Sequence, residues 1–199
     1  MQTAFEELIQ RRRSVRRFKS QAVDRSALRA LIEAARLHPS AANKQPLVFI
    51  AVDEPEMVKA VTNTVKFAGY LPPEQKPGPE EAPQAYIIIC QNKDLALSES
   101  IRDVGAAAMT VLLGACAHGL GACWMRSINF PQLSQILGLG DDVEIDSVIA
   151  LGWPAEAPVV VEMKEGDVKY WLDESGLLHV PKRAWEEVTF LNGFKKPWD

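Results

Sequence analysis

The stretch Arg11-Arg12-Arg13-Ser14-Val15-Arg16-Arg17-Phe18 is the feature around which the rest of this chain is organised. Its five guanidinium groups fall within seven residues, so neighbouring charges lie within the roughly 8 Å screening length of physiological salt. An extended backbone alternates its side chains, which predicts Arg12, Ser14 and Arg16 on one side. Two guanidinium groups that flank a hydroxyl suit a phosphate. The competing interpretation is a solvated basic face or a weak nucleic-acid patch.

Composition limits the classes of function. The chain has 199 residues and a formal net charge of −4, from 22 basic and 26 acidic residues. This length favours one domain, and the acidity argues against a general nucleic-acid binder. No uninterrupted apolar run approaches the roughly 18 residues of a membrane span, and the N-terminus lacks an apolar signal core. The odd number of cysteines, in apolar surroundings, indicates reduced thiols in a cytoplasmic protein.

Hydrophobic periodicity and turn residues predict an α+β fold with a mixed sheet between helices. The expected helices start near Thr3, at Asp24, at Asp53 and at Ser98, and a short one covers Pro131–Leu137. The Asp53 helix is expected to end near Phe67, and the Ser98 helix is the longest, ending near His118. The expected strands are Leu47–Val52, Tyr86–Cys90, Ala122–Met125 and Asp146–Leu151, followed by a hairpin of Val168–Leu172 and Leu177–Val180 around Asp173–Gly176.

Two segments have no packed element of their own. Tyr70–Pro83 holds five prolines, and a loop of that length inside a compact domain is usually functional or mobile, so we expect a rim or lid. Phe190–Asp199 is rich in aromatic residues and lacks evident support. The glycines of Gly119–Gly121 begin a dinucleotide fingerprint, but Trp124 occupies the third glycine position and a helix precedes the motif. That fingerprint therefore fails.

Several catalytic classes lack their signatures. His38, His118 and His179 do not have the paired spacing of zinc sites, so no metal site is predicted. No Gly-x-Ser-x-Gly elbow for nucleophilic hydrolysis is present. The remaining polar pieces suit a ligand with a phosphate, a polyol and a flat hydrogen-bonding ring. They are the arginine stretch, the Pro39–Pro46 loop, the turn into Trp124-Met125-Arg126, and Lys182-Arg183.

Five motifs in this order and spacing resemble the nitroreductase family of FMN-dependent oxidoreductases, and the resemblance covers nearly the whole chain. They are Arg12-Arg13-Ser14-Val15-Arg16-Arg17-Phe18, Pro39-Ser40-Ala41-Ala42-Asn43-Lys44-Gln45-Pro46, Gly119-Leu120-Gly121-Ala122-Cys123-Trp124-Met125, Leu151-Gly152-Trp153-Pro154 and Val180-Pro181-Lys182-Arg183. Each motif alone is weakly specific, whereas the ordered set is strongly so.

The resemblance implies cofactor contacts position by position. The family segment that holds the FMN phosphate and ribityl chain matches Arg12, Arg13, Ser14 and Arg16, and Lys182 with Arg183 match the pair that completes the phosphate site. A loop that meets the flavin from the partner subunit matches Pro39, Ser40, Ala41, Asn43 and Gln45. The segment that passes the flavin ring matches Trp124, Met125 and Arg126.

The resemblance also implies an architecture and an activity. The expected fold is a single domain over residues 1–199, an α-β-α sandwich of three layers with a mainly antiparallel mixed sheet. The resemblance implies a homodimer with flavin at the interface. In such a dimer, residues 190–199 would form a C-terminal arm that lies on the partner subunit. The implied reaction passes electrons from NADH or NADPH (NAD or NADP when oxidised) through FMN to a nitroaromatic or quinone, by a ping-pong mechanism. No side chain is assigned as catalytic.

One departure leaves the pyrimidine side of the flavin without assigned contacts. Many family members carry an Asn and a Lys before the second strand, where this chain offers only Gln75 and Lys76. Three alternatives therefore remain open. They are another flavin reaction on the same scaffold (dehalogenation, flavin fragmentation or heterocycle oxidation), a non-enzymatic FMN-binding module, and, more remotely, a basic-arm nucleic-acid binder.

Overall fold

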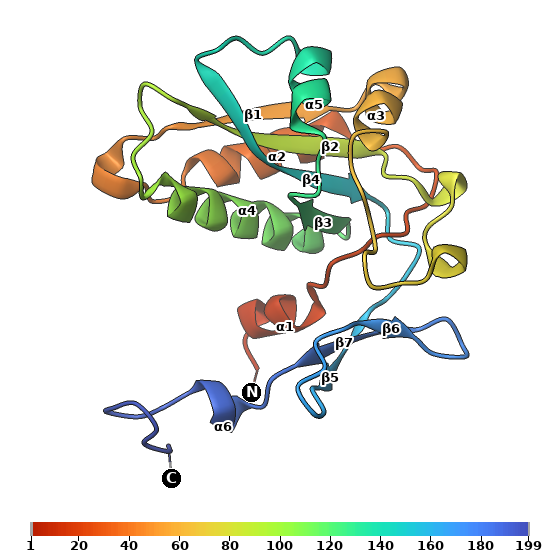
Figure 1. Ribbon diagram of the computed structural model, residues 1–199, viewed down its shortest axis with the longest axis vertical. Helices are drawn as coiled ribbons and strands as arrows, with labels where there is room; N and C mark the ends of the chain where they lie inside the picture. Colours follow the sequence, from red (N-terminus) through yellow and green to blue (C-terminus); the bar gives the residue numbers. More distant parts are fainter. Residues whose placement is uncertain (1, 199) are drawn as a thin grey trace. The chain divides into compact units, whose positions relative to one another are not determined.

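The computed structural model describes residues 2–198 and divides them into two compact units (Figure 1). The first unit contains the chain up to Ala68 together with Pro77–Glu156, and the second contains Gly69–Lys76 and the chain from Ala157 onward. The Pro-rich segment expected as a rim is thus shared between the units. The single domain over residues 1–199 and the role of 70–83 as a lid stay predictions.

A four-stranded antiparallel sheet forms the centre of the first unit. Its strands are β1 (Leu47–Val52), β2 (Ala85–Asn92), β3 (Gly121–Met125) and β4 (Val143–Gly152), in the order β1-β2-β4-β3. A β-bulge interrupts the β2–β4 register between Ile89 and Cys90. The four strands expected from the apolar runs are all present, and β2 and β4 extend beyond the expected ends.

Helices cover both faces of this sheet, because successive residues of its central strands point to opposite sides. Ile87 and Ile89 of β2 pack in one apolar cluster with α2 (Arg25–Arg36) and α4 (Ser100–Ala117). Ile88 and Cys90 pack in the other cluster with α3 (Pro55–Thr62) and α5 (Phe130–Leu137). Figure 1 shows α2 and α4 on one side of the sheet and α3 and α5 on the other. The expected α-β-α layering is confirmed.

The third expected helix was wrong at both ends. Glu54 rather than Asp53 is its N-cap, accepting a hydrogen bond from the Met57 amide, and Asp53 instead pairs with Arg25. The helix stops at Thr62 because the following residues form tertiary backbone bonds with residues 127–129. The Asn129 amide donates to the Thr64 carbonyl at 2.7 Å and the Lys66 amide to the Ser127 carbonyl at 3.0 Å.

The longest helix, α4, begins at Ser100 and ends at Ala117, two residues inside the expected start and one inside the expected end. Gly119 follows with φ of 74°, and the Leu120 amide closes the end by donating to the Ala115 carbonyl. By length and composition alone α4 could span a membrane, which the sequence reading did not anticipate. Its Val104, Ala108 and Val111 are fully buried against the sheet, so it is the central helix of this core.

The second unit holds a mixed three-stranded sheet in the order β5-β7-β6. Its strands are β5 (Val159–Glu162), β6 (Trp171–Leu172) and β7 (Leu178–Lys182), with β5 parallel and β6 antiparallel to β7. The expected hairpin turn is confirmed. Asp173 Oδ1 accepts from the Ser175 and Leu177 amides at 2.9 and 3.0 Å, and Gly176 takes φ of 81°.

The remaining elements are short. They are α1 (Ala4–Arg11), the 3-10 turns η1 (Ala41–Asn43), η2 (Pro73–Gln75) and η3 (Pro79–Glu81), and α6 (Trp185–Val188). The expected capping box of Thr3 and Glu6 is present at the start of α1. Beyond α6 the chain exposes large apolar side chains, with Phe194 79% exposed. The expected dependence of this segment on a partner subunit stays a prediction.

Candidate functional site

The arginine segment, residues 12–17, is extended and lies along the edge strand β3. Helix α1 ends at Arg11, Arg12 has extended φ and ψ, and Ser14 forms a parallel bridge with Ala122. The Val15 amide donates to the Ala122 carbonyl at 2.9 Å. Farther along, the Lys19 amide donates to the Trp153 carbonyl at 2.8 Å. The segment is thereby fixed between β3 and the residues that follow β4.

Two glycines allow this close approach. A Cβ atom on Gly121 would lie 2.7 Å from Cγ1 of Val15, and one on Gly152 would lie 2.8 Å from Cδ1 of Phe18. Side-chain atoms do not tolerate such distances, so any larger residue would displace the arginine segment. The sequence analysis placed Gly121 in a failed dinucleotide fingerprint and in one family motif, and it did not find this role, because a packing requirement between distant segments leaves no local pattern.

Arg12, Ser14 and Arg16 supply polar groups of the kind that suit a phosphate. The Arg12 Nε is buried and has no hydrogen-bond partner among residues 2–198, and an unpaired buried donor is costly unless a ligand accepts from it. An Arg16 guanidinium nitrogen lies 3.4 Å from the Ser14 carbonyl oxygen. The donor set fits an anionic group such as the FMN phosphate.

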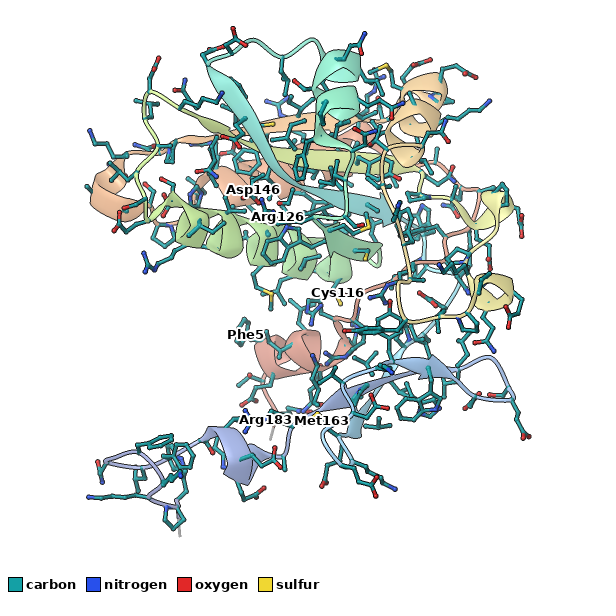
Figure 2. The ribbon with its side chains drawn as sticks, viewed as in Figure 1. Phe5, Cys116, Arg126, Asp146, Met163 and Arg183 are labelled. Atoms are coloured by element: carbon teal, nitrogen blue, oxygen red, sulfur yellow. The ribbon has the colours of Figure 1, made fainter. Side chains whose placement is uncertain are left out.

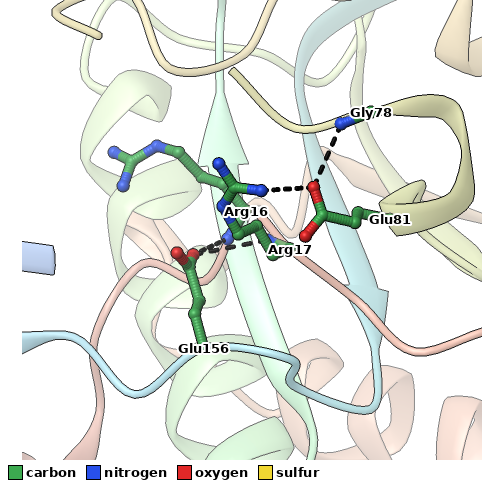
Figure 3. A network of polar contacts seen from close by, with 5 residues as sticks. All are labelled: Arg16, Arg17, Gly78, Glu81 and Glu156. Carbon is green, nitrogen blue, oxygen red and sulfur yellow. Dashed lines mark hydrogen bonds and ion pairs between the residues drawn. The ribbon is translucent and has the colours of Figure 1, made fainter. Parts of the chain in front are cut away.

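Arg13 and Arg17 contact other groups. The Arg13 guanidinium donates to the Gln10 carbonyl at 2.6 Å and the Ile9 carbonyl at 3.2 Å, at the end of α1, and burial lowers its pKa. Arg17 forms an ion pair with Glu81, whose side chain also accepts from the Gly78 amide at 3.1 Å (Figure 3). The run of arginines is therefore divided among different partners. The assignment of Arg13 to the cofactor stays a prediction.

Glu156 binds the arginine segment, a contact that the sequence analysis missed. Its Oε1 accepts hydrogen bonds from the backbone amides of both Arg16 and Arg17, the latter at 3.3 Å (Figure 3). Burial raises the pKa of the Glu156 carboxyl, against the lowering effect of these bonds and the two positive charges. A solitary acid two residues after Pro154 belongs to no motif, so nothing in its local sequence indicated this contact.

The Pro39–Gln45 loop holds an unusual backbone conformation. Ala42, Asn43 and Gln45 have φ values of 49°, 52° and 48°, a left-handed region that side chains disfavour. The Gln45 amide donates to Ser40 Oγ at 3.0 Å, and the Ala41 amide donates to Oδ1 of buried Asp103 at 3.2 Å. These bonds stabilise an exposed polar loop in one shape, as a binding loop requires. Asp103, on α4, was also missed.

The exit of β3 is fixed by side-chain bonds. The Trp124 indole donates to Ser147 Oγ at 2.7 Å, and Met125 is buried. Arg126 Nε donates to the Asp146 carbonyl at 3.0 Å, and the guanidinium lies 6.0 Å from the Phe130 ring centroid. Figure 2 shows Arg126 and Asp146 within the first unit, and a cavity of about 440 Å³ opens beside Arg126.

The second unit carries the other predicted cations. Lys182 ends β7 opposite Glu162 of β5, and Arg183 Nε lies 3.1 Å from Oε2 of Glu187. Figure 2 marks Arg183 at this point of the chain. Gln75 ends η2 and Lys76 follows it. The joining of Lys182 and Arg183 with the arginine segment at one phosphate stays a prediction.

Comparison with known proteins finds relatives that are similar to this chain over about three quarters of its length. A protein of Archaeoglobus fulgidus, named for NADH dehydrogenase/NAD(P)H nitroreductase, is 29% identical over 75% of this chain and 84% of its own length. A Thermus thermophilus NADH dehydrogenase is 29% identical over 73% and 84%. A Rhodospirillum rubrum 5,6-dimethylbenzimidazole synthase is 26% identical over 79% and 85%.

A solved nitroreductase of Desulfovibrio desulfuricans in complex with FMN is 25% identical and superposes with a TM-score of 0.68, covering 87% of this chain and 98% of that one. The family model described as "Nitroreductase family" matches residues 9–153. That range contains the arginine segment, the Pro39–Gln45 loop and β3, three segments that the sequence analysis expected to bind a cofactor. The chain belongs to the nitroreductase family.

Proposed function

We propose that this protein is an FMN-dependent oxidoreductase that passes electrons from NADH or NADPH to a small electron-poor acceptor, such as a nitroaromatic or a quinone. The observation that carries the proposal is the unpaired, buried Arg12 Nε in an extended segment that also holds Ser14 and Arg16. The FMN complex of the Desulfovibrio relative supports the choice of anion, and the names of the Archaeoglobus and Thermus relatives support the nicotinamide donor.

The chain's own residues bind and orient the cofactor in this proposal. Arg12, Ser14 and Arg16 donate to the phosphate, and Lys182 with Arg183 are assigned to it by the family resemblance alone. The hydrogen bond from Trp124 to Ser147 fixes β3, the strand that passes the flavin ring. The Pro39–Gln45 loop covers the flavin ring bound by the partner subunit. Bound flavin supplies the hydride and electron transfer. No side-chain acid or base is assigned to the reaction.

We further propose that the protein works as a homodimer in the cytoplasm. Phe194 and Trp198 are exposed beyond α6, and burial against a second copy would remove that apolar surface from water. The three cysteines are free thiols, which fits a reducing compartment. Sedimentation analysis of the full chain and of a version ending at Thr189 tests the dimer. The full chain should sediment as a dimer, and loss of the arm should weaken it.

The decisive experiment is an absorbance spectrum of the purified protein before and after anaerobic addition of NADH or NADPH. We expect a yellow protein, or one that turns yellow with added FMN, and bleaching by at least one nicotinamide. Stopped-flow reoxidation with nitroaromatics and quinones then identifies the acceptor. A colourless protein that does not retain added FMN would contradict the proposal. Retained FMN without turnover would favour a binding module.

A second candidate follows from the Rhodospirillum relative, which is named as a 5,6-dimethylbenzimidazole synthase. In that case the flavin would be consumed as a substrate in a fragmentation reaction. Chromatography of reduced FMN after aerobic incubation with the protein separates the two candidates. Recovery of intact FMN after many turnovers supports the cofactor role, and loss of FMN with appearance of the benzimidazole supports the second candidate.

A further inference from the structure

We propose that Glu156 is a positioning residue for the phosphate part of the cofactor site. Its carboxylate holds the backbone at Arg16 and Arg17 so that the two side chains take different directions. Figure 3 shows the Arg17 side chain meeting Glu81 and the Arg16 side chain extending away from it. The inference deepens the proposed function and rests on it, because it concerns the shape of the same phosphate site.

The backbone contacts around Arg17 are the first support. The Arg16 and Arg17 amides both donate to Glu156 Oε1, and the Ala155 amide donates to the Arg17 carbonyl at 2.9 Å. Residues 155 and 156 therefore bind both polar backbone groups of Arg17. With these bonds in place, the segment cannot rotate about its axis, and the side on which Arg16 emerges is fixed.

The second support is the electrostatic cost of this arrangement. Glu156 is partly buried beside a segment that we propose to bind a phosphate, and burial raises the pKa of its carboxyl. A negative charge there repels an incoming anion. The carboxylate at this position accepts two amide hydrogen bonds at once, which offsets that repulsion. Without it, the Arg16 and Arg17 amides would lose this partner.

Glu81 completes the arrangement from another part of the chain. It ends η3, binds the Arg17 guanidinium, and offers its own carbonyl to the Phe18 amide at 3.0 Å. The bond with Arg17 lowers the pKa of the Glu81 carboxyl. Arg17 is thereby held away from a phosphate bound by its neighbours. Two carboxylates thus select which guanidinium groups of a dense cluster face the ligand.

Riboflavin provides the control ligand, because it has the ring and ribityl chain of FMN without the phosphate. The experiment measures the dissociation constants of FMN and riboflavin for the full-length apoprotein by flavin fluorescence, together with thermal unfolding. The variants are Glu156→Ala, Glu156→Gln and Glu156→Asp, and the matched control is Glu56→Ala, an exposed glutamate on α3.

Glu156→Ala should weaken FMN about tenfold more than riboflavin, which corresponds to about 1.4 kcal/mol. Glu156→Gln should retain FMN affinity within about threefold, because its amide oxygen accepts the same bonds without the charge. Glu156→Asp keeps the charge but is one methylene shorter, so it should weaken FMN more than riboflavin even where the alanine variant does not fold. Glu56→Ala should match the wild type.

Three results would overturn the inference. Equal losses for FMN and riboflavin would show a general structural role. Tighter FMN binding by Glu156→Ala would show that the residue acts only by repulsion. Wild-type affinity in both Glu156→Ala and Glu156→Asp would show that the contacts do not matter. A wild-type protein that binds riboflavin and FMN equally, or binds neither, would contradict the proposed phosphate site itself. That result separates a failure of the proposed function from a failure of the role of Glu156.

Discussion

Arg16 and Arg11 carry the same charge in very different surroundings. Arg11 is exposed at the end of α1 and donates to the Cys116 carbonyl at 3.1 Å. Arg16 lies in the arginine segment, beside Ser14 and with its amide bound to Glu156. Such differences between neighbours of one type cannot be read from composition.

Arg16→Ala should weaken FMN binding by about tenfold or more, as expected for the loss of a charge-assisted bond to phosphate. Arg11→Ala should change it less than about threefold, because it removes a screened charge and one exposed hydrogen bond, to the Cys116 carbonyl. Fluorescence titration of both apoproteins checks the prediction. Equal losses would show that the basic stretch acts only through its total charge.

Cys90 should resist alkylation in the folded protein. It is fully buried in β2, and burial raises the pKa of its thiol to about 12, whereas alkylation requires an exposed thiolate. We expect mass spectrometry after iodoacetamide treatment at pH 8 to find Cys90 unmodified and the partly exposed Cys116 labelled. Both should label in denaturant, and rapid native labelling of Cys90 would contradict the β2 packing.

At the level of elements, the approach of the arginine segment to β3 depends on glycine. Gly121→Ala should destabilise the protein by about 1–3 kcal/mol, the usual cost of overpacking, and weaken FMN because the new methyl displaces Val15. Gly105→Ala on α4 is the matched control, since nothing lies within 4 Å of its added Cβ. That variant should be neutral or more stable by up to about 1 kcal/mol. Thermal unfolding and FMN titration report both effects.

The turn of the second unit should depend on pH through Asp173. Its hydrogen bond with His179, and then those with Ser175 and Leu177, lower the pKa of the Asp173 carboxyl. A lowered pKa in the folded state means that the stabilisation is present above the unfolded pKa of about 3.9 and is lost as pH falls through the folded value.

Asp173→Ala should therefore speed amide exchange at Leu177 relative to the wild type at pH 6, with a ratio that shrinks only below about pH 4. Hydrogen exchange resolved by NMR measures it. A ratio that has already reached one at pH 5 would show that Asp173 does not stabilise the turn as a carboxylate.

The strands and most helices could be predicted from the sequence, since apolar runs and alternation carry that information locally. The N-cap and length of α3 could not, because Asp53, the intrinsically better cap, pairs with Arg25 instead and the end at Thr62 depends on backbone bonds to residues 127–129. The same limit applies to the Pro39–Gln45 loop. Its polar residues were found, whereas its anchor, Asp103, lies 62 positions from Ala41.

At the level of the whole molecule, FMN should stabilise the folded state because it binds the folded protein and not the unfolded chain. At a free FMN concentration of 100 times the dissociation constant, the gain is about 2.7 kcal/mol. We expect a higher unfolding midpoint with FMN than with riboflavin at the same concentration, since the arginine segment adds phosphate contacts. Calorimetry of the apoprotein with each flavin checks this. Equal shifts would indicate that the phosphate makes no net contribution.

The sequence by itself determined most of the elements, the α-β-α class and the family, because side-chain periodicity, caps and ordered motifs are local patterns. It also picked out the segments that we propose to bind the cofactor, since five arginines in seven residues and two proline-bounded or glycine-led turns stand out in composition. Only the tertiary structure decided which arginine does what. Arg17 pairs with Glu81, and Arg16 is held by Glu156, 140 positions away. Contacts between residues so far apart leave no pattern in the sequence, because the folded backbone alone brings them together.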